Sequence, residues 1–210
     1  MMMRTHYLQQ LSELEDLLGK MGGLIVGGLA DARKAMETRS DDAVRAATNV
    51  EARTDVKLDE IDRLCSLLLL TQQPVASDMR FIVSVMNIVV DMERIGDQTR
   101  DIAETARKCK TPPMRDELVK MADCCTVMLS GALDAFIGRD VDRARKMIDM
   151  DDVVDEAFDQ LQLSLSENVK KTADVGDLLN FLMIGKYLER IADHATNIAE
   201  WTNYVVTGTK

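Results

Sequence analysis

Two segments of equal length decide how this chain folds. Asp91-Met-Glu-Arg-Ile-Gly-Asp-Gln-Thr-Arg-Asp-Ile-Ala-Glu104 aligns with Tyr187-Leu-Glu-Arg-Ile-Ala-Asp-His-Ala-Thr-Asn-Ile-Ala-Glu200 at a constant offset of 96 residues, and seven of the fourteen positions are identical. Upstream, Glu51-Ala-Arg-Thr-Asp55 aligns with Asp151-Asp-Val-Val-Asp155 at an offset of 100 residues. The chain therefore contains two copies of one unit, which differ by four residues in an intervening turn, where loops vary most easily.

Helical periodicity extends outward from both segments and is interrupted at five places. The breaks fall at residues 39–42, 73–74, 111–113, 138–140 and 172–176, and all three prolines lie in them. Proline cannot continue a helix interior, so its positions agree with these boundaries. The pattern predicts six helices, over residues 5–38, 42–71, 77–110, 114–138, 141–169 and 175–206.

Two units of three helices define the expected fold class, which is all-α. Short connections make neighbouring helices antiparallel. We therefore expect two tandem antiparallel three-helix bundles related by a pseudo-twofold axis, the first over residues 1–111 and the second over residues 112–210. The linker Thr111–Pro113 is short and stiff, so the two bundles should pack against each other.

Charge and composition narrow the possible partners. The 210 residues carry a formal net charge of −10, and aromatic residues make up only 4%. Such a negative surface repels nucleic acid and anionic lipid headgroups and suits cations or basic protein partners, although it also serves solubility alone. We expect no direct nucleic-acid binding.

The cysteines and apolar segments bear on the expected compartment. Cys65, Cys109, Cys124 and Cys125 show no Cys-x-x-Cys spacing, so we expect reduced, buried thiols and a cytoplasmic protein. The N-terminus has no apolar signal-peptide core. Phe81–Val90, the longest apolar stretch, is too short to span a bilayer, so no membrane insertion is expected.

Helix geometry places the repeated acidic residues away from the core. At about 100° per residue, each repeated helix has one apolar stripe facing inward. The stripes are Ile88, Met92, Ile95, Thr99, Ile102 and Ala106, and Ile184, Leu188, Ile191, Ala195 and Ile198. Opposite them fall Glu93, Asp97, Asp101 and Glu104, and Glu189, Asp193, Asn197 and Glu200.

A second acidic pair in each unit could join the first. The second predicted helix carries Glu51 and Asp55, and the fifth carries Asp151 and Asp155. On each of these helices the acidic pair projects beside the apolar stripe and not opposite it. If the two helices lie side by side, four carboxylates converge on one groove. Such an oxygen-rich site suits Mg, Mn, Fe or Zn. A merely solvated acidic face is the competing interpretation.

Histidine offers little to enzyme chemistry in this chain. His194 follows Asp193 and could extend a metal site, but a single histidine on a polar helix face is more often exposed. Neither histidine has a glutamate three residues before it, which excludes a ferritin-type di-iron centre. We also find no Ser-His-Asp or Cys-His arrangement, so we expect no enzyme.

The two acidic helices and the turn Gln72-Gln-Pro-Val-Ala-Ser-Asp-Met-Arg80 resemble the PhoU family of phosphate-uptake regulators over essentially the whole chain. The resemblance implies metal ions, Fe or Zn first and Mn or Mg next, singly or in multinuclear clusters. The implied ligands are Glu51, Asp55, Glu93 and Asp97 in the first unit, and Asp151, Asp155, Glu189 and Asp193 in the second. Asp101 is an added ligand candidate, whereas its counterpart Asn197 is a weaker one.

The resemblance also implies a role and partners. Members of the family act in the cytoplasm at the inner face of the membrane and restrain phosphate uptake and the phosphate-starvation response. They contact the ATP-binding subunit of the phosphate ABC transporter and a sensor histidine kinase. Two alternatives stay open, a metal-dependent enzyme or metal store and a structural scaffold. Helical faces rich in Met and Ile are also compatible with a homodimer.

Overall fold

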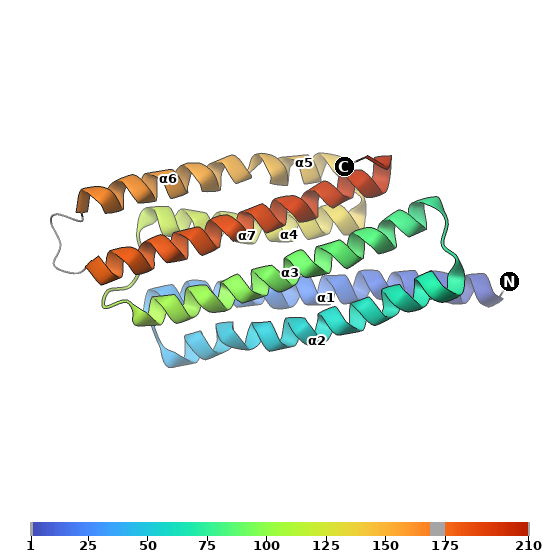
Figure 1. Cartoon of the computed structure of the whole chain (residues 1–210), viewed down its shortest axis with the longest axis horizontal. Coiled ribbons are helices and arrows are strands. Elements are labelled where there is room, and N and C mark those ends of the chain that lie inside the picture. The colour runs from blue at the N-terminus through green and yellow to red at the C-terminus, as the bar shows by residue number, and fades with distance from the viewer. Residues whose placement is uncertain (1, 169–174, 210) are drawn as a thin grey trace.

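The computed structural model describes residues 2–168 and 175–209, and this part of the chain consists of helices and connections without a strand. The helices lie nearly parallel to the long axis of an elongated molecule, and both chain ends lie near the same end (Figure 1). Their bounds are α1 Met2–Thr38, α2 Asp41–Gln72, α3 Ala76–Lys108, α4 Asp116–Gly138, α5 Val141–Asp149, α6 Asp151–Asn168 and α7 Val175–Thr207.

The helices form two three-helix bundles, which confirms the predicted fold class. The first bundle contains α1, α2 and α3, and the second contains α4, α7 and the α5–α6 pair. Helices α3 and α7 pack side by side at the centre of the molecule and run in opposite directions (Figure 1). The two bundles therefore pack against each other, as the short linker predicts. The domain boundary at residues 111 and 112 stays a prediction.

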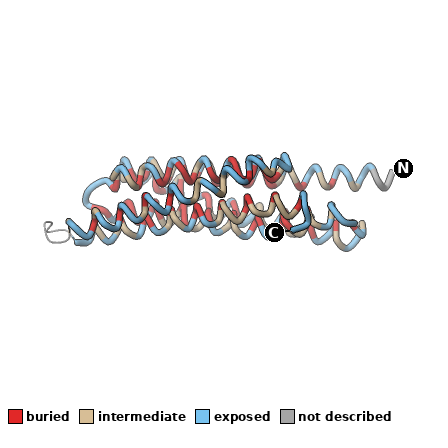
Figure 2. Tube along the Cα trace, turned by 90° about the horizontal axis from the view of Figure 1, so that it is seen from above, coloured by how far each residue is buried: buried red, intermediate tan, exposed pale blue. Residues whose placement is uncertain are grey.

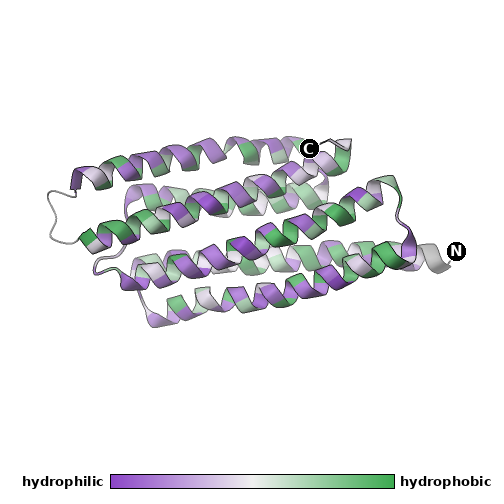
Figure 3. Ribbon diagram, in the orientation of Figure 1, coloured by the Kyte–Doolittle hydropathy of each residue, from purple (hydrophilic) through white to green (hydrophobic). Residues whose placement is uncertain are grey.

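The core follows the stripes expected from helical periodicity. Every residue of the two predicted stripes is buried. Buried positions recur along the inner sides of the helices (Figure 2), and hydrophobic and hydrophilic residues are mixed along their lengths (Figure 3). The buried side chains of both bundles belong to one hydrophobic cluster. The four cysteines are free and buried, as expected.

The predicted helix over residues 141–169 is wrong in one respect, because it is divided at Met150. The Met150 N–H bonds to the Met147 carbonyl at 3.3 Å, and the Val153 N–H bonds to the Met150 carbonyl at 3.1 Å. These bonds span three residues instead of four and locally tighten the helix. No glycine or proline marks this place in the sequence.

One described helix, α4, is long and apolar enough to cross a membrane by length and composition alone. This helix is not the segment expected from the sequence, where Phe81–Val90 is the longest apolar stretch. Of the apolar window in α4, 61% is buried inside the bundle, as is usual for a core helix. Leu118, Met128, Leu129 and Phe136 are among its fully buried side chains.

Candidate functional site: two carboxylate clusters

The first carboxylate cluster comprises Glu51 and Asp55 of α2 with Glu93, Asp97 and Asp101 of α3. The side chains of Glu93 and Asp97 are each 24% exposed, and that of Glu51 is 34% exposed. Helix geometry alone predicted that Glu93 and Asp97 lie opposite the core and face water. In the structure both side chains are partly buried. Helix α3 is central and packs against α1, α2 and α7, so little of its surface faces water. Glu104, one turn farther on, is exposed as expected.

Arg100 lies inside the first cluster and links its two helices. Its guanidinium donates to the Glu51 carboxylate across α2 and α3, and it also bonds Asp101 at 3.0 Å. Its Nη1 lies 3.9 Å from Asp97 Oδ1. Arg94 adds weaker contacts, at 3.4 Å to Glu93 and 3.7 Å to Asp97. The protein itself therefore supplies cations to these carboxylates.

The charges in this cluster shape the pKa of its members. The pKa of Glu93 is raised, mainly because the side chain is partly buried. The charge of Arg94 lowers this pKa, and the charge of Asp97 raises it. Burial likewise raises the pKa of Asp97. The positive charge of Arg100 lowers this pKa, and the negative charge of Glu51 raises it further. The paired carboxylates in turn raise the pKa of Arg100. The five acidic groups are thus close enough to act as one electrostatic unit.

The second carboxylate cluster comprises Asp151 and Asp155 of α6 with Glu189 and Asp193 of α7. The pKa of Asp151 is raised from 3.8 to about 6, mainly because the side chain is partly buried. The negative charges of Asp155 and Asp193 contribute further. Burial followed by Glu189 raises the pKa of Asp155 and of Asp193. The structure thus brings together the four acidic residues that the repeat predicts in this unit.

Less of the negative charge is compensated in the second cluster. Lys186 bonds Glu189, and its ammonium group also lies 5.7 Å from the centre of the Phe158 ring. Asp151 Oδ1 is buried without a hydrogen bond of normal geometry among the described residues, and its nearest donor is the Thr196 hydroxyl, which opposes the rise in the pKa of Asp151. No lysine or arginine pairs with Asp151 in the described part of the chain, so this carboxylate is less compensated than those beside Arg100.

A polar contact joins the two bundles beside the clusters. His194 Nδ1 of α7 lies 2.8 Å from Asp91 Oδ1 of α3, and Asn197 Nδ2 donates to the same oxygen at 3.4 Å. His194 is therefore half-buried and paired, not simply exposed. Asp101 of α3 lies close enough to Tyr187 of α7 to affect its ionisation. The pKa of the Tyr187 phenol is raised mainly by burial and further by the negative charge of Asp101. Asp91 with Asn197 and Tyr187 with Asp101 are equivalent pairs at the offset of 96, as a pseudo-twofold axis requires.

In the conformation of the structure the described carboxylate side chains do not form a metal site. To coordinate an ion, they would have to change rotamer. Within residues 2–168 and 175–209, no three His, Cys, Asp or Glu side chains form a group that could hold a metal ion. The donor set consists of half-buried and exposed carboxylates, Asp55, Asp155 and Asp193 being exposed, and carboxylate oxygens suit a hard or borderline cation. Rotation of exposed carboxylate side chains is fast and needs no change of fold.

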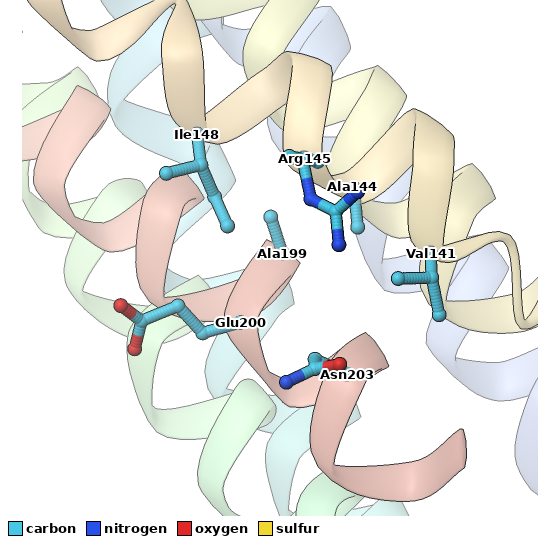
Figure 4. Close-up of a pocket in the computed structure, with 7 residues that line it drawn as sticks. All are labelled: Val141, Ala144, Arg145, Ile148, Ala199, Glu200 and Asn203. Carbon is cyan, nitrogen blue, oxygen red and sulfur yellow. The ribbon is translucent and has the colours of Figure 1, made fainter. Parts of the chain in front are cut away.

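A separate pocket of about 240 Å³ lies between α5 and α7, next to the second cluster (Figure 4). Its walls include Ala144 and Ile148 of α5 and Ala199 of α7, with Arg145, Glu200 and Asn203 at its polar edge. Glu200 follows Asp193 by seven residues, or about 10 Å along the helix axis. The pocket is thus adjacent to the carboxylates but is not formed by them.

Arg100 and Asp91 are not among the residues that the sequence predicts for the site. The bond from Arg100 to Glu51 depends on the register between α2 and α3, which the sequence of one helix does not reveal. The pairing of Asp91 with Asn197 could have been inferred from the repeat, because antiparallel helices related by a twofold axis place equivalent residues in reciprocal contact.

These features define a class of protein: a duplicated helical protein with a carboxylate cluster in each of two bundles. The sequence matches the PhoU domain family over residues 18–106 and 118–202. The chain belongs to the PhoU family.

Individual relatives agree with this assignment. The phosphate-specific transport system accessory protein PhoU homolog of Synechocystis is 34% identical, with 98% of this chain and 93% of that protein aligned. The crystal structure of PhoU from Pseudomonas aeruginosa has a TM-score of 0.92 at 30% identity and covers 97% of this chain and 100% of that one. The phosphate transport system regulatory protein PhoU from Streptococcus pneumoniae has a TM-score of 0.90 at 26% identity and covers 97% and 98%.

Proposed function

We propose that this chain is an accessory protein of a phosphate-specific transport system, which restrains phosphate uptake and the phosphate-starvation response. The supporting observation is the full-length similarity to relatives that carry this name, with 98% of this chain aligned to the Synechocystis protein. The similarity includes both bundles, so it is not confined to one shared module.

We further propose that the protein acts by contact and not by catalysis. Its partners are the ATP-binding subunit of the phosphate ABC transporter and the sensor histidine kinase of the response. It works in the cytoplasm, peripheral to the inner membrane through these partners. Relatives are named as accessory or regulatory proteins, which supports a role without turnover.

Co-purification and gene deletion test this proposal together. A tagged chain purified from phosphate-replete cells should recover the transporter subunit or the kinase. Deletion of the gene should raise expression of starvation genes in replete medium, and the intact gene should reverse this. Recovery of neither partner, with starvation genes unchanged in the deletion strain, would contradict the proposal.

We also propose that the two clusters bind metal ions. The observation that favours this is the mutual repulsion of Asp151, Asp155, Glu189 and Asp193. Burial and then this repulsion raise the pKa of Asp151, Asp155 and Asp193. The equivalent ligands in the first unit are Glu51, Asp55, Glu93 and Asp97, with Asp101 as an added one. A bound cation would screen the repulsion among these groups. Fe and Zn are the first candidates, and Mn and Mg the next.

Anomalous scattering from crystals grown without added metal tests the metal proposal directly. It should show an ion at each cluster and identify the element. The paired variants Asp97→Asn and Asp193→Asn should each lose the ion at their own cluster only. Absence of anomalous signal, with no binding of Fe, Mn or Zn at micromolar concentration, would remove the proposal. A phosphatase assay on the loaded protein separates binding from the enzyme alternative.

A further inference from the structure

An open groove lies between α1 and α2, on the surface of the first bundle. Its volume is about 510 Å³, and its apolar lining includes Gly23, Leu24, Ala52 and Val56. Val56 is 57% exposed although it is a large hydrophobic residue. We call this feature the α1–α2 groove. It offers apolar surface that is left uncovered by the described residues of the chain.

The edge of the α1–α2 groove is basic, in contrast to the chain as a whole. Lys20, Arg53 and Lys57 line it, whereas the formal net charge of the chain is −10. Lys57 donates to Glu60 at 2.5 Å. Among the described residues, neither Lys20 nor Arg53 forms an ion pair, whereas Lys57 does. Two cationic side chains at the groove are therefore available to an anionic partner.

A glycine in the groove has no role in the packing of the chain itself. A Cβ atom added at Gly23 would meet nothing within 4 Å, whereas one at Gly28 would lie 2.4 Å from Val50 Cγ2. Gly28 is thus explained by internal close packing against Val50. Gly23 is exposed in the middle of a helix, where glycine is less stable than alanine. An external helix that approaches closely would account for it.

We propose that the α1–α2 groove docks an acidic amphipathic helix of a protein partner. Two antiparallel helices leave a groove of the shape that a third helix fills, and the apolar face of that helix would cover Leu24 and Val56. Its carboxylates would pair with Lys20 and Arg53. Nucleic acid and anionic membranes present negative charge too, but the carboxylate clusters and the net charge would repel extended anionic surfaces. Docking of such a helix does not depend on the proposed role in phosphate transport.

Site-specific photo-crosslinking in cells tests this assignment. A photoreactive amino acid replaces Val56 in the full chain, and the matched control replaces Val127 of α4, which is similarly exposed at 52%. Mass spectrometry then identifies the crosslinked segment. We expect an acidic amphipathic helix of another protein at Val56, with a yield at least tenfold above that at Val127.

Two variants decide whether the groove itself captures the partner. Gly23→Leu fills the groove from a position with no neighbouring atoms, and leucine is the better helix former, so the fold should persist. Arg53→Glu reverses one charge at the edge. Each should reduce the crosslinking yield at least tenfold while circular dichroism stays unchanged. A basic segment, a lipid, a nucleic acid or a second copy of this chain as the adduct would overturn the proposal. So would a yield equal to the Val127 control, or one that neither variant changes.

Discussion

The first and second carboxylate clusters occupy equivalent places in the two bundles but satisfy their charges differently. In the first, Arg100 bonds Glu51 and Asp101 and lies near Asp97. The residue equivalent to Arg100 at the offset of 96 is Thr196, which carries no charge. The first cluster thus contains its own cation, whereas the second relies on Lys186, which bonds only Glu189 among its four acidic residues.

This difference bears on an expectation from the sequence. Because Asp101 has the weaker ligand Asn197 as its counterpart, the sequence favours the first unit as a metal site, and this stays a prediction. In the structure Asp101 is paired with the guanidinium of Arg100, whereas Asp151 of the second unit has only the Thr196 hydroxyl beside it and no cation among the described residues. A duplicated motif can therefore retain its ligands and still diverge in the charge that surrounds them. If both clusters bind metal, we expect the second to bind more tightly.

Exchange of the two equivalent residues should give the largest effect. Thr196→Arg places a positive charge in the second cluster, and Arg100→Thr removes one from the first. Repulsion between a guanidinium and a divalent ion a few ångströms away costs about 2 kcal/mol or more, which is roughly a thirtyfold change in affinity. Zn²⁺ or Mn²⁺ titration calorimetry should show weaker binding to the second cluster of T196R and tighter binding to the first cluster of R100T.

The matched controls for this exchange are Asp193→Asn in T196R and Asp97→Asn in R100T, which identify the cluster responsible for each binding event. Unchanged affinities in both exchange variants would show that the cation content of the clusters does not control metal binding.

The pH dependence of stability should also separate the clusters, with opposite signs. The pKa of Asp151 in the folded chain is about 6, above the ordinary value of 3.8. The folded chain therefore holds this proton more tightly, so the free energy of unfolding falls as the pH rises from about 4 to 6. Asp151→Asn cannot ionise and escapes this loss. After allowance for solvent screening, we expect it to be more stable than the parent by about 2 kcal/mol at pH 7.5 in chelator, with no advantage near pH 4.

In the first cluster, removal of the cation should have the reverse effect. Arg100→Thr leaves the carboxylates of Glu51, Asp97 and Asp101 without their main partner, which should lower stability by about 1 to 2 kcal/mol at pH 7.5. The loss should shrink as acid protonates the carboxyl groups. Urea denaturation at several pH values measures both variants. Equal pH profiles for D151N and R100T would break the comparison.

The fold was predictable because its signals are local and repeated. The apolar stripes from Ile88 to Ala106 and from Ile184 to Ile198 follow from periodicity, and three prolines mark connections. The break at Met150 was not predictable, because it arises from a shift in hydrogen-bond spacing without a residue that disfavours helix. Local sequence thus determined the elements but not the small distortions that packing imposes.

The membership of each cluster was predictable, but its electrostatics were not. The spacing of Glu93 and Asp97, and their repetition at Glu189 and Asp193, placed the carboxylates on one side of each helix. The half-burial of Glu93, Asp97 and Glu189 depends on α3 and α7 being central, which the sequence of either helix alone does not reveal. The bond from Arg100 to Glu51 joins residues 49 positions apart and requires the register of two helices.

The contact between the bundles gives the next smaller effect. His194→Ala removes the hydrogen bond to Asp91 and leaves a half-buried carboxylate with only the longer contact from Asn197. We expect a loss of about 1 to 2 kcal/mol in the free energy of unfolding, measured by urea denaturation at pH 7.5. His194→Gln restores the residue type of the equivalent Gln98 and should recover part of the loss. An effect no larger than that of an exposed control such as Glu104→Ala would show that the contact does not stabilise the interface.

The smallest effect tests the single difference inside the repeated Glu-Arg-Ile-x-Asp string, where Gly96 aligns with Ala192. A Cβ atom at Gly96 would lie 3.0 Å from Thr54 Oγ1, and that hydroxyl donates to the Glu51 carbonyl at 2.7 Å, so it is held in place. In Gly96→Ala the crowding should offset the helical gain of about 1 kcal/mol and leave stability nearly unchanged. Ala192 is fully buried, so Ala192→Gly has no such compensation and should cost about 1 kcal/mol or slightly more. Thermal unfolding of the two variants should therefore differ in midpoint. A clear stabilisation by G96A would mean that α2 and α3 can separate at the first cluster, and the position of Glu51 beside Arg100 would then be less rigid than its counterpart in the second bundle.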